Sequence, residues 1–90
     1  MSRKHLSSTS ANAQRKRLLE ALQTLGAVNT LYARDRLNIM APAPRIKELR
    51  EQGHQIHTDR ISITDRNGFA HENVARYVLI KLAGGEHATL

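Results

Sequence analysis

Leucines recur at helical spacing near the beginning of the chain. Leu18, Leu22 and Leu25 lie three or four positions apart, and mostly charged or polar residues stand between them. Apolar residues at this spacing form one stripe along an α-helix, which is buried against the rest of a domain. The pattern predicts a helix over about residues 12–25, and Gly26 is suited to end it in a left-handed conformation.

A short second helix is predicted soon after this glycine. Residues 27–29 form at most a very short strand, and Thr30 is suited to cap a helix over 31–37. Asn38 tolerates the positive φ that ends such a helix. The side chains able to face the first helix are those of Leu31, Ala33 or the stem of Arg34, and Leu37.

Two prolines mark the start of a third helix. Pro42 and Pro44 would break a helix interior, but a first turn tolerates proline because its N–H groups have no acceptor within the helix. The sequence therefore predicts a tight turn and then a helix over residues 42–52, which ends before a glycine. Ile46 and Leu49 lie three positions apart and are predicted to face the core.

A β-hairpin is predicted for the last third of the chain. Residues 55–64 are rich in Ile and Thr, residues 65–68 read Asp-Arg-Asn-Gly, and residues 75–82 are mostly apolar. Asn-Gly favours a tight hairpin turn, and the flanking compositions are typical of strands. Ile56 is out of phase with the later isoleucines of its strand, so we expect the first strand to carry a bulge or to bend midway.

This order of elements predicts an α+β fold. Three helices followed by an antiparallel hairpin form a winged helix-turn-helix, in which the hairpin is the wing. One apolar sheet face and three apolar helix stripes are buried only by packing against one another. We expect one domain over residues 12–82, a flexible basic N-terminal arm over 1–11 and a flexible C-terminal tail over 83–90, because neither end has a periodic apolar pattern.

Three segments of the sequence carry a family resemblance. They are Arg45-Ile46-Lys47-Glu48-Leu49-Arg50 followed by Gly53 within residues 41–56, residues 17–22, and residues 75–79. Together they resemble a winged helix-turn-helix domain family common in phages and prophages, and they span most of the predicted domain. Pro44 departs from the small residue expected at its position. The resemblance implies a winged helix-turn-helix fold and DNA binding.

The charge of the chain points to a nucleic-acid partner. Lys and Arg number 14 against 8 Asp and Glu, which gives a formal net charge of +6 at pH 7. Such an excess attracts polyanions over long range. The chain has only 1 Phe, 2 Tyr and no Trp, whereas many single-strand binders stack bases on several exposed rings. Double-stranded DNA is therefore the predicted partner.

Missing sequence features narrow the function further. The chain has no cysteine, which excludes disulfides, iron–sulfur clusters and thiol nucleophiles. Its longest apolar run, residues 77–80, is far shorter than the roughly 20 residues of a membrane span, and no segment resembles a signal peptide. We expect a soluble cytoplasmic protein, associated with the nucleoid when bound to DNA, with no membrane partner and no evident small-molecule substrate.

The third helix supplies the first candidate DNA contacts. With its apolar pair inward, Ala43 and Lys47 are the best candidates to face the major groove. Arg45 could donate to guanine or to a phosphate. Arg45 and Arg50 could instead lie along the edge of the core and pair with neighbouring carboxylates.

The wing, over residues 64–73, and the second helix supply the other candidates. Arg66 and Asn67 lie at the predicted hairpin tip, where the turn needs Asn for its backbone but does not need Arg66. Arg66 is therefore a candidate phosphate contact, or else a solvated turn arginine. Thr30 and Tyr32 could donate hydrogen bonds to a phosphate, although capping and core packing explain them equally well.

No cofactor, metal site or catalytic centre is predicted. His54 and His57 would point to opposite faces of a strand, which is unsuited to a shared metal ion. Asp59, Asp65 and Glu72 are better explained by turns and surface pairing than by a magnesium site. We therefore expect no enzyme activity.

Two functions compete on this sequence. The first is a small DNA-binding protein of phage or prophage type, acting as a transcriptional regulator or accessory factor, with residues 42–52 in the major groove. The alternative is a winged-helix module that binds a protein through the same helix face, since Glu48 and Glu51 would repel phosphates there. We expect a monomer or weak homodimer that pairs on DNA.

Overall fold

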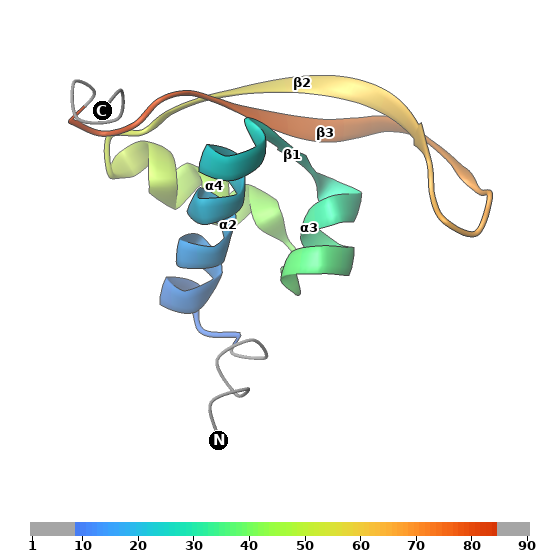
Figure 1. Ribbon diagram of the computed structural model, residues 1–90, viewed down its shortest axis with the longest axis horizontal. Helices are drawn as coiled ribbons and strands as arrows, with labels where there is room; N and C mark the ends of the chain where they lie inside the picture. The colour runs from blue at the N-terminus through green and yellow to red at the C-terminus, as the bar shows by residue number, and fades with distance from the viewer. Residues whose placement is uncertain (1–8, 85–90) are drawn as a thin grey trace.

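The computed structural model describes residues 9–84 and has three helices against one face of a three-stranded antiparallel sheet (Figure 1). The elements are α2 (Ala11–Leu25), β1 (Ala27–Asn29), α3 (Thr30–Leu37), α4 (Pro42–Glu51), β2 (Gln55–Thr64) and β3 (Ala70–Lys81). The sheet order is β1-β3-β2. This confirms the predicted α+β fold with its wing. The predicted arm over 1–11 and tail over 83–90 lie mostly outside the described residues.

α2 begins one residue before its predicted start because Ser10 caps it. The Ser10 Oγ accepts a hydrogen bond from the Ala13 N–H at 3.1 Å, and the first helical residue follows the cap directly. Leu18 and Leu22 are fully buried, as their spacing predicts, but the prediction that Leu25 continues the buried stripe is wrong, because at the helix end it is 53% exposed. Gly26 follows the last helical residue at a φ of 85°, which glycine adopts without strain.

α3 is capped by Asn29, so the prediction that Thr30 is the cap is wrong. The Asn29 Oδ1 accepts a hydrogen bond from the Tyr32 N–H at 2.8 Å, and Thr30 is the first helical residue. A cap residue needs an extended backbone, which the end of β1 supplies at Asn29 with φ −98° and ψ 169°. Asn38 ends the helix in the left-handed region, as predicted.

α4 is anchored by its apolar side. Pro42 is the first helical residue, and Ile46 and Leu49 are each 1% exposed, as predicted. The helix ends at Glu51, one residue before the predicted end, because Gln52 already forms its C-cap. Since α4 packs against α2, α3 and β2, its opposite side faces away from the core.

β3 begins at Ala70, well before the start predicted at Ala75. Its first residues pair with the end of β2, in the register Ile63 with His71 and Thr64 with Ala70. This part of the hairpin extends beyond the helices and forms the wing (Figure 1). Strand residues that do not pack on a core are not required to alternate between apolar and polar. The sequence pattern therefore does not identify these residues as a strand.

The bulge predicted for the first strand of the hairpin lies in the second. Ile61 pairs with Val74 and Ile63 pairs with His71, so β3 has two residues where β2 has one. Asn73, within this insertion, has a φ of 61°, which Asn tolerates better than most residues. A second register shift lies between Gln55 and Ile56, where β3 again has the extra residue, Ile80. The hairpin is therefore irregular, but the bulge predicted for β2 is wrong, since both extra residues lie in β3.

One apolar core joins the helices to the sheet. Ala33 is fully buried and Arg34 is exposed, so Ala33 and not the stem of Arg34 faces inward. The buried core residues are Leu18, Leu22, Val28, Ala33, Ile39, Ile46, Leu49, Ile56, Ala75 and Tyr77. On β3 the core extends toward the wing only as far as Ala75, beyond which the hairpin projects.

Candidate nucleic-acid interface

The exposed side of α4 carries the two residues predicted to face the major groove. Ala43 and Lys47 are both exposed, on the side away from the buried Ile46 and Leu49. Lys47 has no ion-pair partner among residues 9–84. Its ammonium group is therefore accessible to a ligand that approaches α4 from solvent.

Arg45 on the same helix is engaged within the fold. Its Nη2 donates to the Glu48 Oε2 at 3.1 Å, and Glu48 also accepts from the Arg15 Nη1 of α2 at 2.8 Å. The Arg45 side chain is only 20% exposed. Two guanidinium groups therefore offset the charge of Glu48 on the predicted reading face. Glu51, the other carboxylate that favoured a protein partner, is exposed and has no ion-pair partner among residues 9–84.

Arg50 joins the end of α4 to the start of β2. Its Nε and Nη2 donate to the Ile56 carbonyl oxygen at 2.9 and 2.7 Å, and its Nη2 also donates to the Thr58 Oγ1 at 2.8 Å. Hydrogen bonds from a charged donor are among the stronger ones in proteins. The geometry gives Arg50 a structural role at the edge of the sheet.

Thr30 and Tyr32 also have partners inside the fold. The Thr30 hydroxyl donates to the Ala75 carbonyl oxygen at 3.3 Å, which links α3 to β3. The Tyr32 N–H is bound by the helix cap at Asn29, and its side chain packs against the core. The structure therefore uses both residues to place α3.

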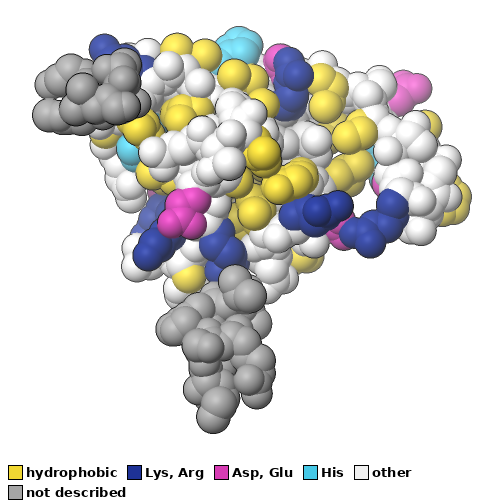
Figure 2. All heavy atoms as spheres, in the orientation of Figure 1, with side chains coloured by type: hydrophobic (Ala, Val, Ile, Leu, Met, Phe, Trp, Pro, Cys, Tyr) yellow, Lys and Arg dark blue, Asp and Glu magenta, His cyan; other side chains and the backbone are white. Residues whose placement is uncertain are grey.

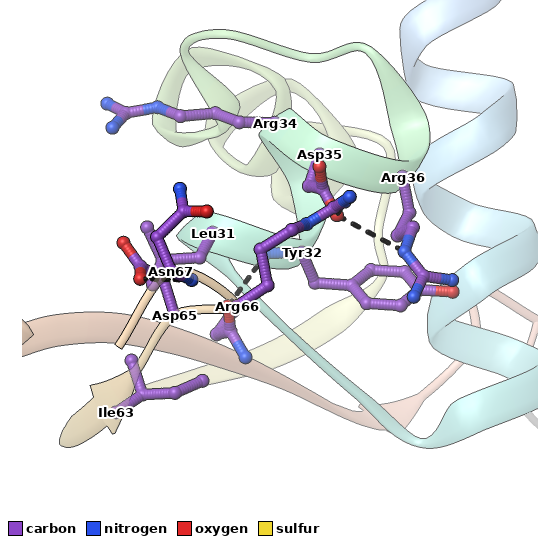
Figure 3. Close-up of a pocket in the computed structure, with 10 residues that line it drawn as sticks. Leu31, Tyr32, Arg34, Asp35, Arg36, Ile63, Asp65, Arg66 and Asn67 are labelled. Carbon is purple, nitrogen blue, oxygen red and sulfur yellow. Dashed lines mark hydrogen bonds and ion pairs between the residues drawn. The ribbon is translucent and has the colours of Figure 1, made fainter. Parts of the chain in front are cut away.

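The wing turns back toward α3 through an ion pair. In Figure 3, Arg66 of the wing turn points to Asp35 of α3, and Arg36 lies on the other side of the same carboxylate. Arg66 is 66% exposed and Asp35 is 45% exposed. The hydrogen bond from Arg66 lowers the pKa of Asp35 below its usual value. Exposed pairs of this kind contribute little to stability, so Arg66 can exchange this partner for another anion.

Asp65 fixes the turn at the tip of the wing. Its Oδ1 accepts from the Asn67 N–H at 2.9 Å and from the Phe69 N–H at 3.0 Å, while its Oδ2 lies 2.8 Å from the His71 Nε2. These bonds lower the pKa of Asp65, and the largest contribution comes from His71. Asn67 is thus held by its backbone, and its exposed side chain is left to solvent.

A hollow of about 690 Å³ lies between the helices and the wing. It is bordered by the start of α3, the first turn of α4 and the first half of β3. Its lining residues are Thr30, Leu31, Arg34, Ala41, Pro42, Ala43, Arg60, Ala70, His71, Glu72, Asn73, Val74, Ala75 and Tyr77. The hollow therefore brings together the wing and two predicted contacts, Thr30 and Ala43.

Arg34 and Arg60 line this hollow, although neither is among the contacts predicted from the sequence. The Arg34 Nε donates to the Met40 carbonyl oxygen at 2.9 Å, and the Arg60 Nη1 donates to the Asn73 carbonyl oxygen at 3.3 Å. Neither guanidinium pairs with a carboxylate within residues 9–84. Arg60 has the same parity as Ile56 along β2, and this signal could have placed it on the helix-facing side.

The remaining predicted contacts do not line this hollow. Arg66, Asn67 and Tyr32 border a second hollow, of about 520 Å³, between α3 and the wing turn, whereas Lys47, Arg45 and Arg50 border neither. Figure 2 shows acidic and hydrophobic side chains among the Lys and Arg side chains of the visible face. The positive charge is thus divided among sites that differ in their partners.

A metal site would need clustered ligands, and a membrane span would need a long apolar helix. Among residues 9–84, no group of three or more His, Asp or Glu side chains is arranged to hold a metal ion. No helix in the same part of the chain is long and apolar enough to cross a membrane.

Comparison with known proteins agrees with the architecture. A family model described as a winged helix-turn-helix domain matches residues 13–82, which covers α2 from its third residue and the whole of α3, α4 and the hairpin. Neither the curated proteins nor the solved structures gave a significant match. Because the match covers most of the chain, the protein belongs to the winged helix-turn-helix domain family.

Proposed function

We propose that the chain binds double-stranded DNA, with α4 in the major groove and the wing on the adjoining DNA backbone. The observation that carries the proposal is the hollow between α4 and the wing. Two arginines without carboxylate partners, Arg34 and Arg60, line it beside the first turn of α4. Guanidinium groups are well suited to bind phosphate, and a helix of this size fits the major groove.

The contacts predicted from the sequence and the two arginines of the hollow have different roles in this proposal. Ala43 and Lys47 face base edges and the neighbouring backbone. Arg34, Arg60 and the α3 start at Thr30 lie along one phosphate strand. Arg66 and Asn67 contact the backbone next to the wing turn, while Arg45, Arg50 and Tyr32 position α3 and α4 rather than contact DNA.

The cellular role in this proposal is that of a small regulator or accessory factor of phage or prophage type. The resemblance of residues 41–56 to such proteins supports it, and so does the net charge of +6. We place the protein in the cytoplasm, on the nucleoid when bound. A monomer pairs with a second copy on adjacent half-sites, as single winged domains gain specificity in this way.

Mobility-shift titrations with duplex DNA across a salt series test the proposal. For each phosphate that the protein neutralises, log K falls by about 0.9 per log unit of salt concentration. Lys47→Glu is expected to weaken binding strongly, whereas Lys81→Glu, the same charge change at an exposed residue on the opposite end of the hairpin from the wing turn, has a smaller effect.

Two results contradict the proposal. One is wild-type protein that fails to bind any duplex at low salt. The other is Lys47→Glu and Lys81→Glu proteins that bind equally well. If nuclease-treated protein instead captured a single host protein through Lys47, the alternative of a protein-binding module would be favoured.

A further inference from the structure

Phe69 is the aromatic residue that the core does not use. Its side chain lies next to the wing turn and is 67% exposed. Tyr77 is 5% exposed, and Tyr32 is partly buried and packs against the core. A single exposed apolar side chain needs no functional explanation. Its importance therefore depends on how the chain holds it and what lies beside it.

The backbone around Phe69 is fixed without the help of its ring. The Phe69 carbonyl oxygen accepts from the Asp65 N–H at 2.9 Å, and the Phe69 N–H donates to the Asp65 Oδ1 at 3.0 Å. Asp65 is held in turn by the Asn67 N–H and by His71. Four polar contacts thus hold the turn while the ring remains in solvent. Such preorganisation reduces the entropy lost when the ring binds a partner.

The wing is long enough to carry this ring past the major groove. Beyond Arg60, which pairs with the core residue Ala75, β2 continues over residues 61–64. At about 3.3 Å per residue, these residues add roughly 13 Å. The major groove is about 12 Å wide, so this extension is about as long as the groove is wide. A wing that lies across the groove edge therefore places its turn at the neighbouring minor groove.

We propose that Phe69 inserts into the minor groove of bound DNA as an apolar wedge that partly unstacks one base step. This inference rests on the proposed function and adds the mode of contact at the wing. Inserted apolar side chains kink duplexes by about 20–90°. Arg66, in the same turn, faces the backbone beside the step. Arg34 and Arg60, which line the hollow beside the wing without carboxylate partners among residues 9–84, favour DNA over a protein as the occupant.

A tryptophan at this position reports the insertion directly. The chain has no Trp, so Phe69→Trp introduces a single indole. On addition of a duplex of about 20 base pairs, acrylamide quenching of the indole is expected to fall severalfold. Anisotropy of a label on the DNA confirms that the complex has formed. An indole that remains as accessible in the complex as in the free protein overturns the wedge.

A second set of variants separates insertion from binding. Phe69→Leu keeps an apolar wedge and is expected to kink the duplex, as measured by energy transfer between its labelled ends. Phe69→Ala is expected to bind about tenfold more weakly, with the kink lost and the salt dependence unchanged. The control is Ile80→Ala, which removes another exposed apolar side chain, 62% exposed, near the opposite end of β3.

The outcomes distinguish the wedge from the proposed function. Phe69→Ala protein that binds and bends DNA like the wild type overturns the wedge and leaves DNA binding intact. Wild-type protein that binds no duplex overturns both. Matching thermal melts of the variants are expected, because the hydrogen bonds that fix the turn do not involve the ring.

Discussion

The arginines of α4 and the arginines around the hollow differ in what they bind. Arg45 pairs with Glu48, and Arg50 donates to Ile56 and Thr58. Arg34 and Arg60 donate only to backbone carbonyl oxygens at the rim of the hollow. A carbonyl oxygen does not neutralise a guanidinium group. Arginines without a carboxylate partner in the described part of the chain therefore line the hollow from α3 and β2. On α4 itself, Lys47 also lacks an ion-pair partner within residues 9–84, and Arg50 is held by three hydrogen bonds to β2, outside the hollow.

This difference shows that an arginine on the recognition helix is not necessarily one that can bind DNA. An arginine on a recognition helix is an obvious candidate contact, but it is also close to the carboxylates and backbone groups of its own fold. The pairing of α4 arginines fixes the position and orientation of the helix. Contact with a phosphate is left to Lys47 and to the arginines that border the hollow without a carboxylate partner among the described residues.

The largest expected effect comes from removing the hollow cations. Arg34→Gln combined with Arg60→Gln is expected to lower the slope of log K against log salt by about 2, since each phosphate contact contributes roughly 1. Lys16→Gln with Lys81→Gln is a matched control, because it removes the same charge at exposed positions elsewhere. Equal slopes for the two double variants would show that Arg34 and Arg60 do not contact phosphates in the complex.

Arg50 is expected to affect stability instead. Arg50→Met removes donors to the Ile56 carbonyl oxygen and should lower the free energy of unfolding by about 1–2 kcal/mol, with a modest change in duplex affinity. Urea denaturation measures the loss, and Lys47→Met serves as the exposed control on the same helix. A variant of Arg50 that melts like the wild type but loses most of its duplex affinity would reverse the assigned roles.

Local signals in the sequence account for most of the fold. The buried pair Leu18 and Leu22, the proline at the start of α4 and Gly68 in the wing turn each act within a few residues, so their effects are predictable. The two-residue Asn-Gly turn predicted there is wrong: Asn67 has no positive φ, and the turn runs from Asp65 to Phe69. The first residues of β3 carry no such signal. They form a strand because they pair with the end of β2 outside the core. Asn73 adopts a positive φ in the bulge that accommodates the extra residue of β3.

The ion pair between the wing and α3 gives a smaller effect of opposite sign. Asp35 competes with phosphate for Arg66, so Asp35→Asn is expected to tighten duplex binding severalfold at low salt. Glu20→Gln, an equal charge change at an exposed residue of α2, serves as the control. If both substitutions strengthened binding equally, net charge and not the ion pair would explain the gain.

The smallest expected effect is the pH dependence of the wing turn. The pKa of Asp65 is lowered from 3.8, mainly by His71, so its contribution to stability is present above pH 3.8 and is lost as the pH falls through the lower folded-state value. The stability difference between wild type and Asp65→Asn should shrink as the pH falls below 3.8. A difference that grows in acid would contradict this assignment.

The ion-pair partners of the candidate contact residues could not be predicted from the sequence, for a physical reason. Arg15 and Glu48 are 33 positions apart, and Arg66 and Asp35 are 31 apart. Such pairs form only when packing brings separate elements together, and no local periodicity encodes them. The sequence does predict that Lys47 lies on the exposed side of α4, because the helical period relates it to buried neighbours.

Guanidinium NMR tests the central comparison most directly. The Nε–Hε resonances of Arg34, Arg60, Arg45 and Arg50 are followed in one titration with duplex DNA. The account predicts that the signals of Arg34 and Arg60 shift and become protected from exchange, while those of Arg45 and Arg50 keep their free-state positions. Large shifts at Arg45 and Arg50, with Arg34 and Arg60 unchanged, would contradict it.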